Sequence, residues 1–205
     1  MAWAPDYVTD TQLKSFVRID DTDDDAEIAF AITAASRAID RSTNRQFGQA
    51  DTAVERFYTA EWDCDRGRWV IEIDDLMTTT GLLIDYDVDD DETYSASIDD
   101  YRLQPVNAAA ESRPWTRIVV HPNSTNKPST GENRTRVTAQ FGWTSVPTTI
   151  KQACLLQASR FLARREAPFG VAGSPDLGSE VRLLAKLDPD VAVMVGPYRR
   201  WWAAA

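Results

Sequence analysis

The segment VPTTIKQACLLQASRFLARREAP, residues 146–168, determines the expected fold. Pro147 suits the first turn of a helix, where no backbone N–H donor is needed, and Pro168 cannot continue a helix. Arginines at positions 160, 164 and 165 favour the negative end of a helix dipole. Apolar side chains recur every three or four residues, which predicts one face of a helix of about five turns: Ile150, Ala153, Cys154, Ala158, Phe161 and Leu162.

A shorter helix is predicted downstream of this segment. Asp188 is a good N-cap, Pro189 suits the first helical position, and Gly196 with Pro197 is a stop signal. Val191, Met194 and Val195 would form its small apolar stripe. The C-terminal third thus contains two helices, the break PFGVAG at 168–173 between them, and a basic aromatic tail.

Two further helices are predicted near the N-terminus. Thr9 followed by Gln12 is a capping box, which opens a helix of about two turns. Its inward residues would be Leu13, Phe16 and Val17. Thr22 or Asp23 is the expected cap of a longer helix that ends near Asn44 and Gly48 and has the stripe Ile28, Ile32, Ala35 and Ile39. Its many alanines keep this helix slim and favour close contact with another helix: Ala26, Ala29, Ala31, Ala34 and Ala38.

Between these pairs of helices the pattern changes to short β-branched or aromatic runs separated by Gly, Pro, Asp and Asn. The runs are 53–58, 68–73, 82–86, 101–103, 117–120 and 134–141. They predict a compact antiparallel sheet or small barrel, with residues 122–132 as an exposed hairpin loop. The expected fold class is α+β, a small helical bundle with the β-rich segment inserted between the second and third helices.

Several parts of the chain together resemble the head-to-tail connector, or adaptor, family of long-tailed bacteriophages. The resemblance covers the C-terminal third well and the first fifty residues in pattern, and it rests on residues 141–143, 146–147, 150–153, 158–160, 164–173, 187–191 and 197–200. It implies a ring, dodecameric by resemblance, that joins the portal of the filled capsid to the tail. It also implies a connector core made by residues 1–50 and 146–205, with residues 51–145 as the insertion.

Composition limits the other classes of function. The 205 residues are 43% hydrophobic and 26% charged, and the net charge of −10 argues against a nucleic-acid-binding surface as the main role. No apolar run reaches the ~20 residues of a membrane span, and no signal peptide is recognised. Two widely separated cysteines favour a reduced, intracellular protein. We therefore expect a soluble protein without a membrane partner. The family resemblance implies that it is located in the virion neck and, during assembly, in the host cytoplasm.

No catalytic, cofactor or metal residues are predicted. His121 is the only histidine, and no Gly-x-Ser-x-Gly elbow, phosphate-binding loop or dinucleotide motif accompanies it. Cys64 and Cys154 cannot form a structural zinc site by themselves. A modest basic cluster near Trp115 could bind single-stranded nucleic acid or could be an ordinary sheet face: Arg113, Arg117, Lys127, Arg134 and Arg136.

The acidic run at residues 85–92 is the most metal-like stretch, because alternate carboxylates can converge on calcium. Counted as an EF-hand loop from Asp85, it has Asp90 where glycine is needed and Ala96 where glutamate is needed. A solvated turn is the simpler interpretation, with weak calcium binding as the alternative. Under the family resemblance the same residues become a candidate acidic lumen or rim of a DNA conduit: Asp85, Asp87, Asp89, Asp90 and Asp91.

The C-terminal tail contains the residue types that dominate interface hot spots. It either packs back on its own domain or docks into a neighbouring ring, and the resemblance implies docking on the portal by Tyr198, Arg199, Arg200, Trp201 and Trp202. The resemblance also implies an adaptable loop at the ring interface, formed by Pro168, Phe169, Gly170, Val171 and Gly173.

These observations lead to one main hypothesis and three rivals. The main hypothesis is a non-enzymatic virion protein whose partners are copies of itself, the portal, a stopper or tail-completion protein, and double-stranded DNA only as passing cargo. The first rival is a head-completion, stopper or tail-completion protein of the same virion. The others are a metal-dependent nuclease or hydrolase that uses Asp87 and Asp89, and a plain intracellular binding domain.

Overall fold

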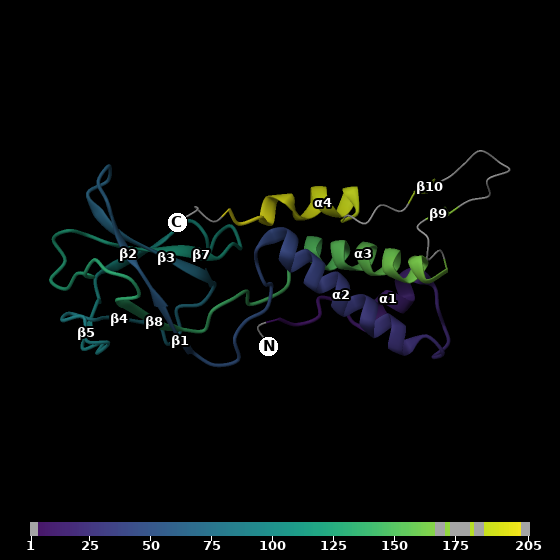
Figure 1. Cartoon of the computed structure of the whole chain (residues 1–205), viewed down its shortest axis with the longest axis horizontal. Coiled ribbons are helices and arrows are strands. Elements are labelled where there is room, and N and C mark those ends of the chain that lie inside the picture. Colours follow the sequence, from purple (N-terminus) through teal and green to yellow (C-terminus); the bar gives the residue numbers. More distant parts are fainter. Residues whose placement is uncertain (1–3, 167–170, 173–180, 183–186, 202–205) are drawn as a thin grey trace. The chain divides into compact units, whose positions relative to one another are not determined.

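The computed structural model describes residues 4–166, 171–172, 181–182 and 187–201 (Figure 1). It confirms the α+β class, because the described residues contain four α-helices and two four-stranded antiparallel sheets. The chain divides into two compact units. We call Pro5–Phe47 with Val146–Ala205 the helical unit, and Gly48–Ser145, grouped with Met1–Ala4, the strand unit.

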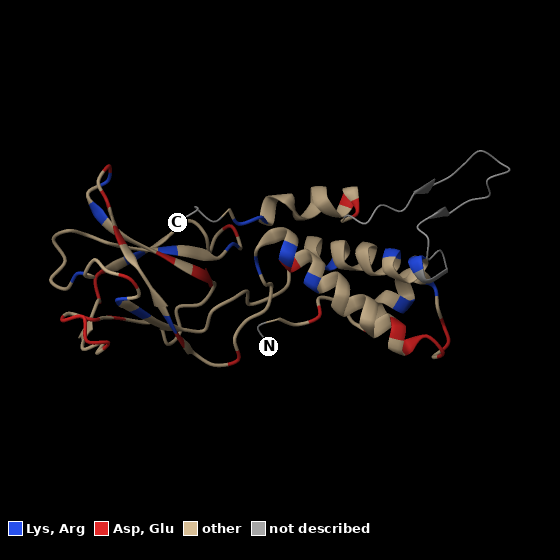
Figure 2. Ribbon diagram, in the orientation of Figure 1, with Lys and Arg blue, Asp and Glu red and all other residues tan. Residues whose placement is uncertain are grey.

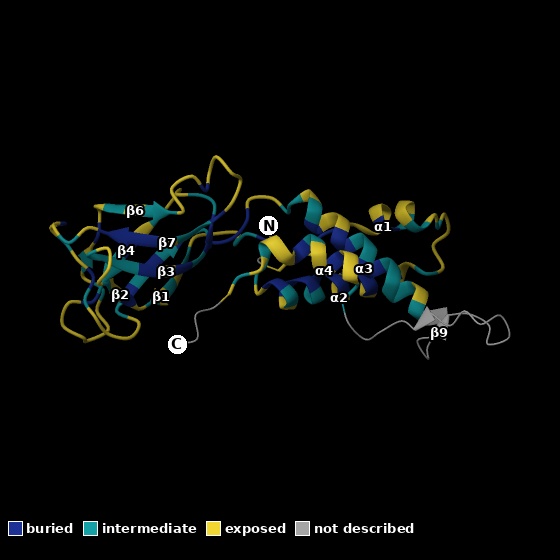
Figure 3. Cartoon of the chain, turned by 90° about the horizontal axis from the view of Figure 1, so that it is seen from above, coloured by how far each residue is buried: buried dark blue, intermediate teal, exposed yellow. Residues whose placement is uncertain are grey.

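The helical unit contains α1 (Asp10–Val17), α2 (Asp25–Thr43), α3 (Thr148–Glu166), α4 (Pro189–Val195) and the 3-10 helix η2 (Gly196–Tyr198). The strands β9 (Val171–Ala172) and β10 (Val181–Arg182) form a short antiparallel pair between α3 and α4. In Figure 3 the helices are buried, in dark blue, on the sides by which they pack and exposed, in yellow, on their outer sides. α2 and α4 both pack on α3, and α1 packs on α2 and α3.

The helix ends follow their local signals with one exception. The capping box at Thr9 and Gln12 is confirmed, with both reciprocal hydrogen bonds present. The predicted cap of α2 is wrong, since the N-cap is Asp24 and its side chain makes no capping bond. Asp188 and Pro189 open α4 and Gly196 is its C-cap, as predicted. The separate 3-10 helix η2 follows directly.

The core of the helical unit is made by the predicted stripes. Both ends of the chain contribute fully or nearly fully buried side chains: Leu13, Ile28, Ile32, Ala35, Ile39, Ile150, Ala153, Cys154, Ala158, Val191 and Val195. Phe16 was predicted to face inward and is instead 41% exposed. Phe161 and Leu162 are only half-buried.

The strand unit contains two sheets, where the sequence predicted a single sheet or small barrel. One has the order β1-β8-β4-β5 and the other β2-β3-β7-β6. Two of the strands, β2 (Ala60–Asp63) and β5 (Ala96–Ser97), were not predicted. The other six strands are β1 (Val54–Tyr58), β3 (Arg68–Leu76), β4 (Leu83–Tyr86), β6 (Tyr101–Gln104), β7 (Trp115–Val120) and β8 (Thr135–Ala139).

Both sheets contribute to one apolar core. Alternation puts Ile71 and Ile73 of β3 into it, together with Val137 of β8. The alternation in β3 then breaks at a register shift between Glu72 and Leu76. After the shift two successive residues, Asp75 and Leu76, are both buried.

Residues 122–132 are not a hairpin loop. They connect β7 to β8, which lie in different sheets. The segment is also less exposed than predicted, since Ser124 and Pro128 are buried and the Ser124 hydroxyl donates to the Asp100 carboxylate at 2.9 Å. Among the described helices none has the length and apolar character to cross a bilayer.

Candidate docking surface

The predicted docking tail begins as part of the helical unit. Tyr198, at the end of η2, packs edge-on against the Phe47 ring with 5.6 Å between centroids. Phe47 is fully buried and packs edge-on against Tyr7 at 5.7 Å. Tyr198 is therefore a packing residue of its own unit, which was the alternative to docking.

Backbone hydrogen bonds extend this attachment to Arg200. The Arg200 N–H donates to the Thr43 carbonyl at 2.8 Å, and the Asn44 side-chain amide donates to the Arg200 carbonyl at 3.2 Å. Thr43 is the last residue of α2, where carbonyls have no partner within the helix. The tail thus caps the end of α2, and its path is fixed through residue 200.

Trp201 is different from the residues before it. Its side chain is 77% exposed, and the Arg199 guanidinium lies over its ring at 4.3 Å. A cation over an indole face at an exposed site contributes about 0.5–1 kcal/mol, which favours this position of the ring without burying it. The five predicted tail residues therefore divide into an attached part, 198–200, and a presented aromatic, Trp201; Trp202 lies outside the described residues.

A buried polar cluster holds Phe47 in position, and sequence reasoning missed it. The Tyr7 hydroxyl accepts the Phe47 N–H at 3.0 Å and donates to the Asp40 carboxylate. Arg37 pairs with the same carboxylate at 3.2 Å. Burial raises the pKa of Asp40, and the Tyr7 and Arg37 interactions oppose that rise. Burial, followed by the bond to Asp40, raises the pKa of Tyr7, so this hydroxyl stays protonated.

The start of α4 is attached to α3. Asp188 accepts the Asp190 N–H at 2.9 Å and also pairs with Arg160 at 3.0 Å. The Gln157 side chain accepts the Asp188 N–H at 3.2 Å. Of the predicted adaptable loop, Pro168, Phe169, Gly170 and Gly173 lie outside the described residues, and only the backbone of Val171, in β9, lies within them.

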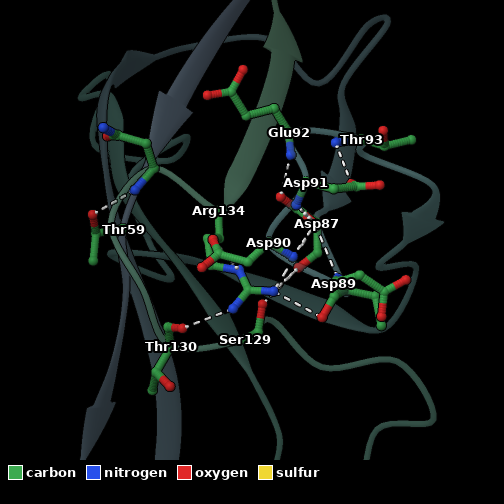
Figure 4. A network of polar contacts seen from close by, with 12 residues as sticks. Thr59, Asp87, Asp89, Asp90, Asp91, Glu92, Thr93, Ser129, Thr130 and Arg134 are labelled. Atoms are coloured by element: carbon green, nitrogen blue, oxygen red, sulfur yellow. Dashed lines mark hydrogen bonds and ion pairs between the residues drawn. The ribbon is translucent and has the colours of Figure 1, made fainter.

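The acidic run forms a closed loop around Asp87 (Figure 4). The Asp87 side chain is 3% exposed. Its carboxylate accepts four backbone N–H groups, those of residues 89 (3.1 Å), 90 (2.8 Å), 91 (3.4 Å) and 92 (2.9 Å). Desolvation would raise the pKa of Asp87, but these donors outweigh it and hold the pKa below its ordinary value.

Arg134 closes the same loop from β8's side (Figure 4). Its guanidinium donates to the carbonyls of Asp87 at 3.0 Å and Val88 at 2.8 Å. The Ser129 hydroxyl donates to the Asp87 carbonyl at 2.8 Å. A planar guanidinium reaches two acceptors at once, so a single side chain fixes the turn.

The five residues of the predicted acidic rim therefore do different things. Asp87 points into its own loop, and Asp85 pairs with Arg136 at 2.9 Å. Asp89, Asp90 and Asp91 are exposed, and the Asp90 carboxylate lies 3.5 Å from the Arg134 guanidinium. Figure 2 colours the acidic residues along the ribbon red. No three carboxylate, histidine or cysteine groups in the described part of the chain are placed to hold a metal ion.

The other side chains considered as candidate sites make local hydrogen bonds, ion pairs or packing contacts. His121 is exposed and its ring Nδ1 accepts the Asn123 N–H at 3.1 Å. Cys154 is fully buried beside Ser36, and burial raises the pKa of its thiol to about 11. In the predicted basic cluster Arg117 pairs with Glu72, and Arg134 and Arg136 pair with carboxylates of the acidic run.

The comparisons with known proteins do not assign a family. No protein-family model matches the chain, and no curated protein matches it.

Proposed function

We propose that this protein is a head-to-tail connector of a long-tailed bacteriophage, a ring between portal and tail through which DNA passes. The helical unit would be the connector core, a small helical bundle, and the strand unit would be its insertion. The proposal starts from the sequence resemblance described above. It gives the molecule a geometric role, with no catalytic step.

The observation that carries the proposal is the C-terminal tail. Its backbone is fixed on α2 as far as Arg200, and the next residue presents an indole that is 77% exposed. Tryptophan and arginine are enriched among the residues that contribute most to binding. A positioned aromatic at the edge of a fixed segment suits a docking contact with a preformed ring.

The acidic loop supports the same proposal in a lesser way. Asp89, Asp90 and Asp91 are held at the surface by the rigid turn around Asp87. Fixed negative charges repel phosphate, which would keep a duplex from adhering during passage. In this proposal Asp87 organises the rim and does not belong to it.

Truncation of the tail tests the proposal. A chain that stops after Arg200 keeps the hydrogen bonds to Thr43 and Asn44, so we expect its unfolding midpoint to stay unchanged. Its binding to purified, portal-bearing capsids of the parent phage should fall at least tenfold, measured by cosedimentation and electron microscopy. Val193→Ala is the matched control, since Val193 is 78% exposed on α4 and outside the tail.

The outcomes separate the rival classes. Undiminished capsid binding by the truncated chain contradicts the tail as the docking element. Binding to purified tails but not to portal-bearing capsids favours a stopper or tail-completion protein. A stable monomer that binds neither portal-bearing capsids nor purified tails favours a plain intracellular binding domain.

A further inference from the structure

Two surfaces of the helical unit are uncovered and chemically complementary. The first is the outer face of α2 around Phe30, a large apolar residue that is 77% exposed in the middle of the helix. Successive helical residues are about 100° apart, so Phe30 lies opposite the face that Ile28, Ile32 and Ile39 bury. Its neighbours one turn away are small and exposed, Ala26 and Ala34. Phe30 therefore projects as an isolated apolar knob.

The second surface is a hollow between α1 and α3. Its volume is about 410 Å³, it is open to solvent, and it is lined by Val8, Thr11, Gln12, Ser15, Lys151 and Leu155. Apolar atoms of Val8, Leu155 and the Lys151 stem can receive a ring there, while polar groups stay at the edge. The hollow belongs to α1 and α3, whereas Phe30 lies on the face of α2 turned away from α3.

Charged side chains beside the two surfaces indicate how one surface would be oriented on the other. Glu27 lies one turn before Phe30, so their side chains are neighbours on the exposed face of α2. Lys151 lies at the edge of the hollow, one turn before Leu155. Both Glu27 and Lys151 are exposed, and neither makes an ion pair within the part of the chain that the structure describes. An acid beside the knob thus matches a base beside the hollow.

We infer that Phe30 of one copy inserts into the α1–α3 hollow of the next copy, with Glu27 facing Lys151. Because knob and hollow are different surfaces, the contact is head-to-tail, and its repetition gives a closed ring or an open helix. The inference rests on the proposed function for ring closure, and it names the subunit interface of that ring. One apolar side chain and one ion pair per interface form a weak contact. We therefore expect the ring to form when the copies are docked on the portal, and the free protein to remain largely unassembled.

Site-directed crosslinking tests this contact. In a Cys64→Ser background that keeps Phe30, one chain carries Ala34→Cys, one turn from Phe30, and a differently tagged chain carries Ser15→Cys. Both sites are exposed, so the fold should be retained. The two chains are mixed, alone and on portal-bearing capsids of the parent phage, and treated with a short bismaleimide. A doubly tagged dimer should form, at least tenfold more than in a mixture of Val193→Cys with Ser15→Cys.

Charge reversal gives a second readout on the same preparations. Glu27→Lys and Lys151→Glu should each lower the yield of crosslinked dimer severalfold. The chain carrying both substitutions should recover it, because the pair is restored with opposite sign. Loss of dimer that the double variant does not recover contradicts the Glu27–Lys151 pairing.

The results distinguish this inference from the proposed function. If the protein binds capsids but no crosslink forms between Ala34→Cys and Ser15→Cys, or Ala34→Cys links to a capsid protein instead, the interface is overturned and the connector role remains. Crosslinking in solution by a chain that does not bind capsids overturns the connector role and leaves the interface. Neither binding nor crosslinking overturns both.

Discussion

Asp87 is a charged side chain that lies inside the strand unit because its own loop supplies its hydrogen-bond donors. Four backbone N–H groups converge on one carboxylate, and Arg134 binds the adjoining carbonyls. Two residues of the turn, Asp90 and Glu92, have φ of 63° and 62°, a left-handed conformation that a non-glycine residue adopts only when its surroundings impose it. The ionised form of Asp87 thus holds the turn.

Asp87→Asn should lower stability and change its pH dependence. A folded-state pKa below the ordinary value means that Asp87 contributes stability above its unfolded pKa, and that this contribution is lost as pH falls through the folded pKa. The variant should unfold at lower urea concentration at pH 7 and show a shallower loss of stability on acidification. Urea titrations from pH 7 to pH 3 measure both effects.

Asp89→Asn is the matched control, because Asp89 is exposed in the same loop and its side chain is not one of the acceptors. It should leave both the midpoint at pH 7 and the acid response unchanged. Equal behaviour of the two variants would contradict the assigned role of Asp87.

At the scale of elements, a close backbone contact between Gly48 and Gly142 joins the first and last segments of the strand unit. Gly142 has φ of 113°, and a Cβ there would lie 2.0 Å from the Gly48 carbonyl oxygen. The Gly142 N–H donates to Asp75, whose side chain accepts the Trp143 indole N–H at 2.7 Å. Only glycine permits this approach.

Gly142→Ala should therefore destabilise the strand unit by at least about 1–3 kcal/mol, the cost of one strained backbone conformation, with the steric contact added. Gly67→Ala is the control, since Gly67 also has positive φ, 61°, but a Cβ there meets nothing within 4 Å. Urea unfolding followed by tryptophan fluorescence compares the two. A loss at Gly142 no larger than at Gly67 would show that the backbone contact is unimportant.

Elements with local signals could be predicted, and their partners could not. The capping box of α1 and the Asp188-Pro189 start of α4 depend on residues within one turn, so the sequence alone places them. The division into two sheets depends on which distant strands pair, and short strands with similar alternation do not specify that. The exposure of Phe30 could not be predicted for a similar reason. An apolar stripe predicts which face of a helix is buried, but it does not predict whether an apolar residue on the opposite face is covered.

The candidate site was predictable to a similar degree. Residue types singled out the tail, but its attachment at Thr43 and Asn44 is a contact across more than 150 residues that no local pattern reveals. The Tyr7–Asp40 pair is equally non-local. Asp87 was grouped with its acidic neighbours because its burial depends on the backbone of the folded turn.

At the scale of the whole molecule, the two ends of the chain form one unit and the middle forms the other. Each unit has its own apolar core, with the strand unit's core drawn from both of its sheets. A unit with its own core can fold alone. The net charge of −10 belongs to the whole chain, and the acidic loop belongs to the strand unit.

Gly48–Ser145 expressed alone should accordingly fold. We expect a β-rich circular dichroism spectrum, one cooperative thermal transition and the same acid response as the full chain, because Asp87 and all its donors are retained. Asp87→Asn in this fragment is the internal control and should make that response shallower, as it does in the full chain. A fragment without a cooperative transition would show that the strand unit depends on the helices.

The hydrogen bonds at Thr43 and Asn44 also determine how the end of the chain responds to a load. A force applied to Trp201 first loads the two hydrogen bonds of Arg200 with Thr43 and Asn44. The C-terminal end of α2 is therefore loaded before α4. If they break, residues 199–201 lose these attachments, and the segment can span at most about 10 Å at ~3.3–3.6 Å per residue. These two hydrogen bonds therefore limit how far Trp201 can lie from the end of α2.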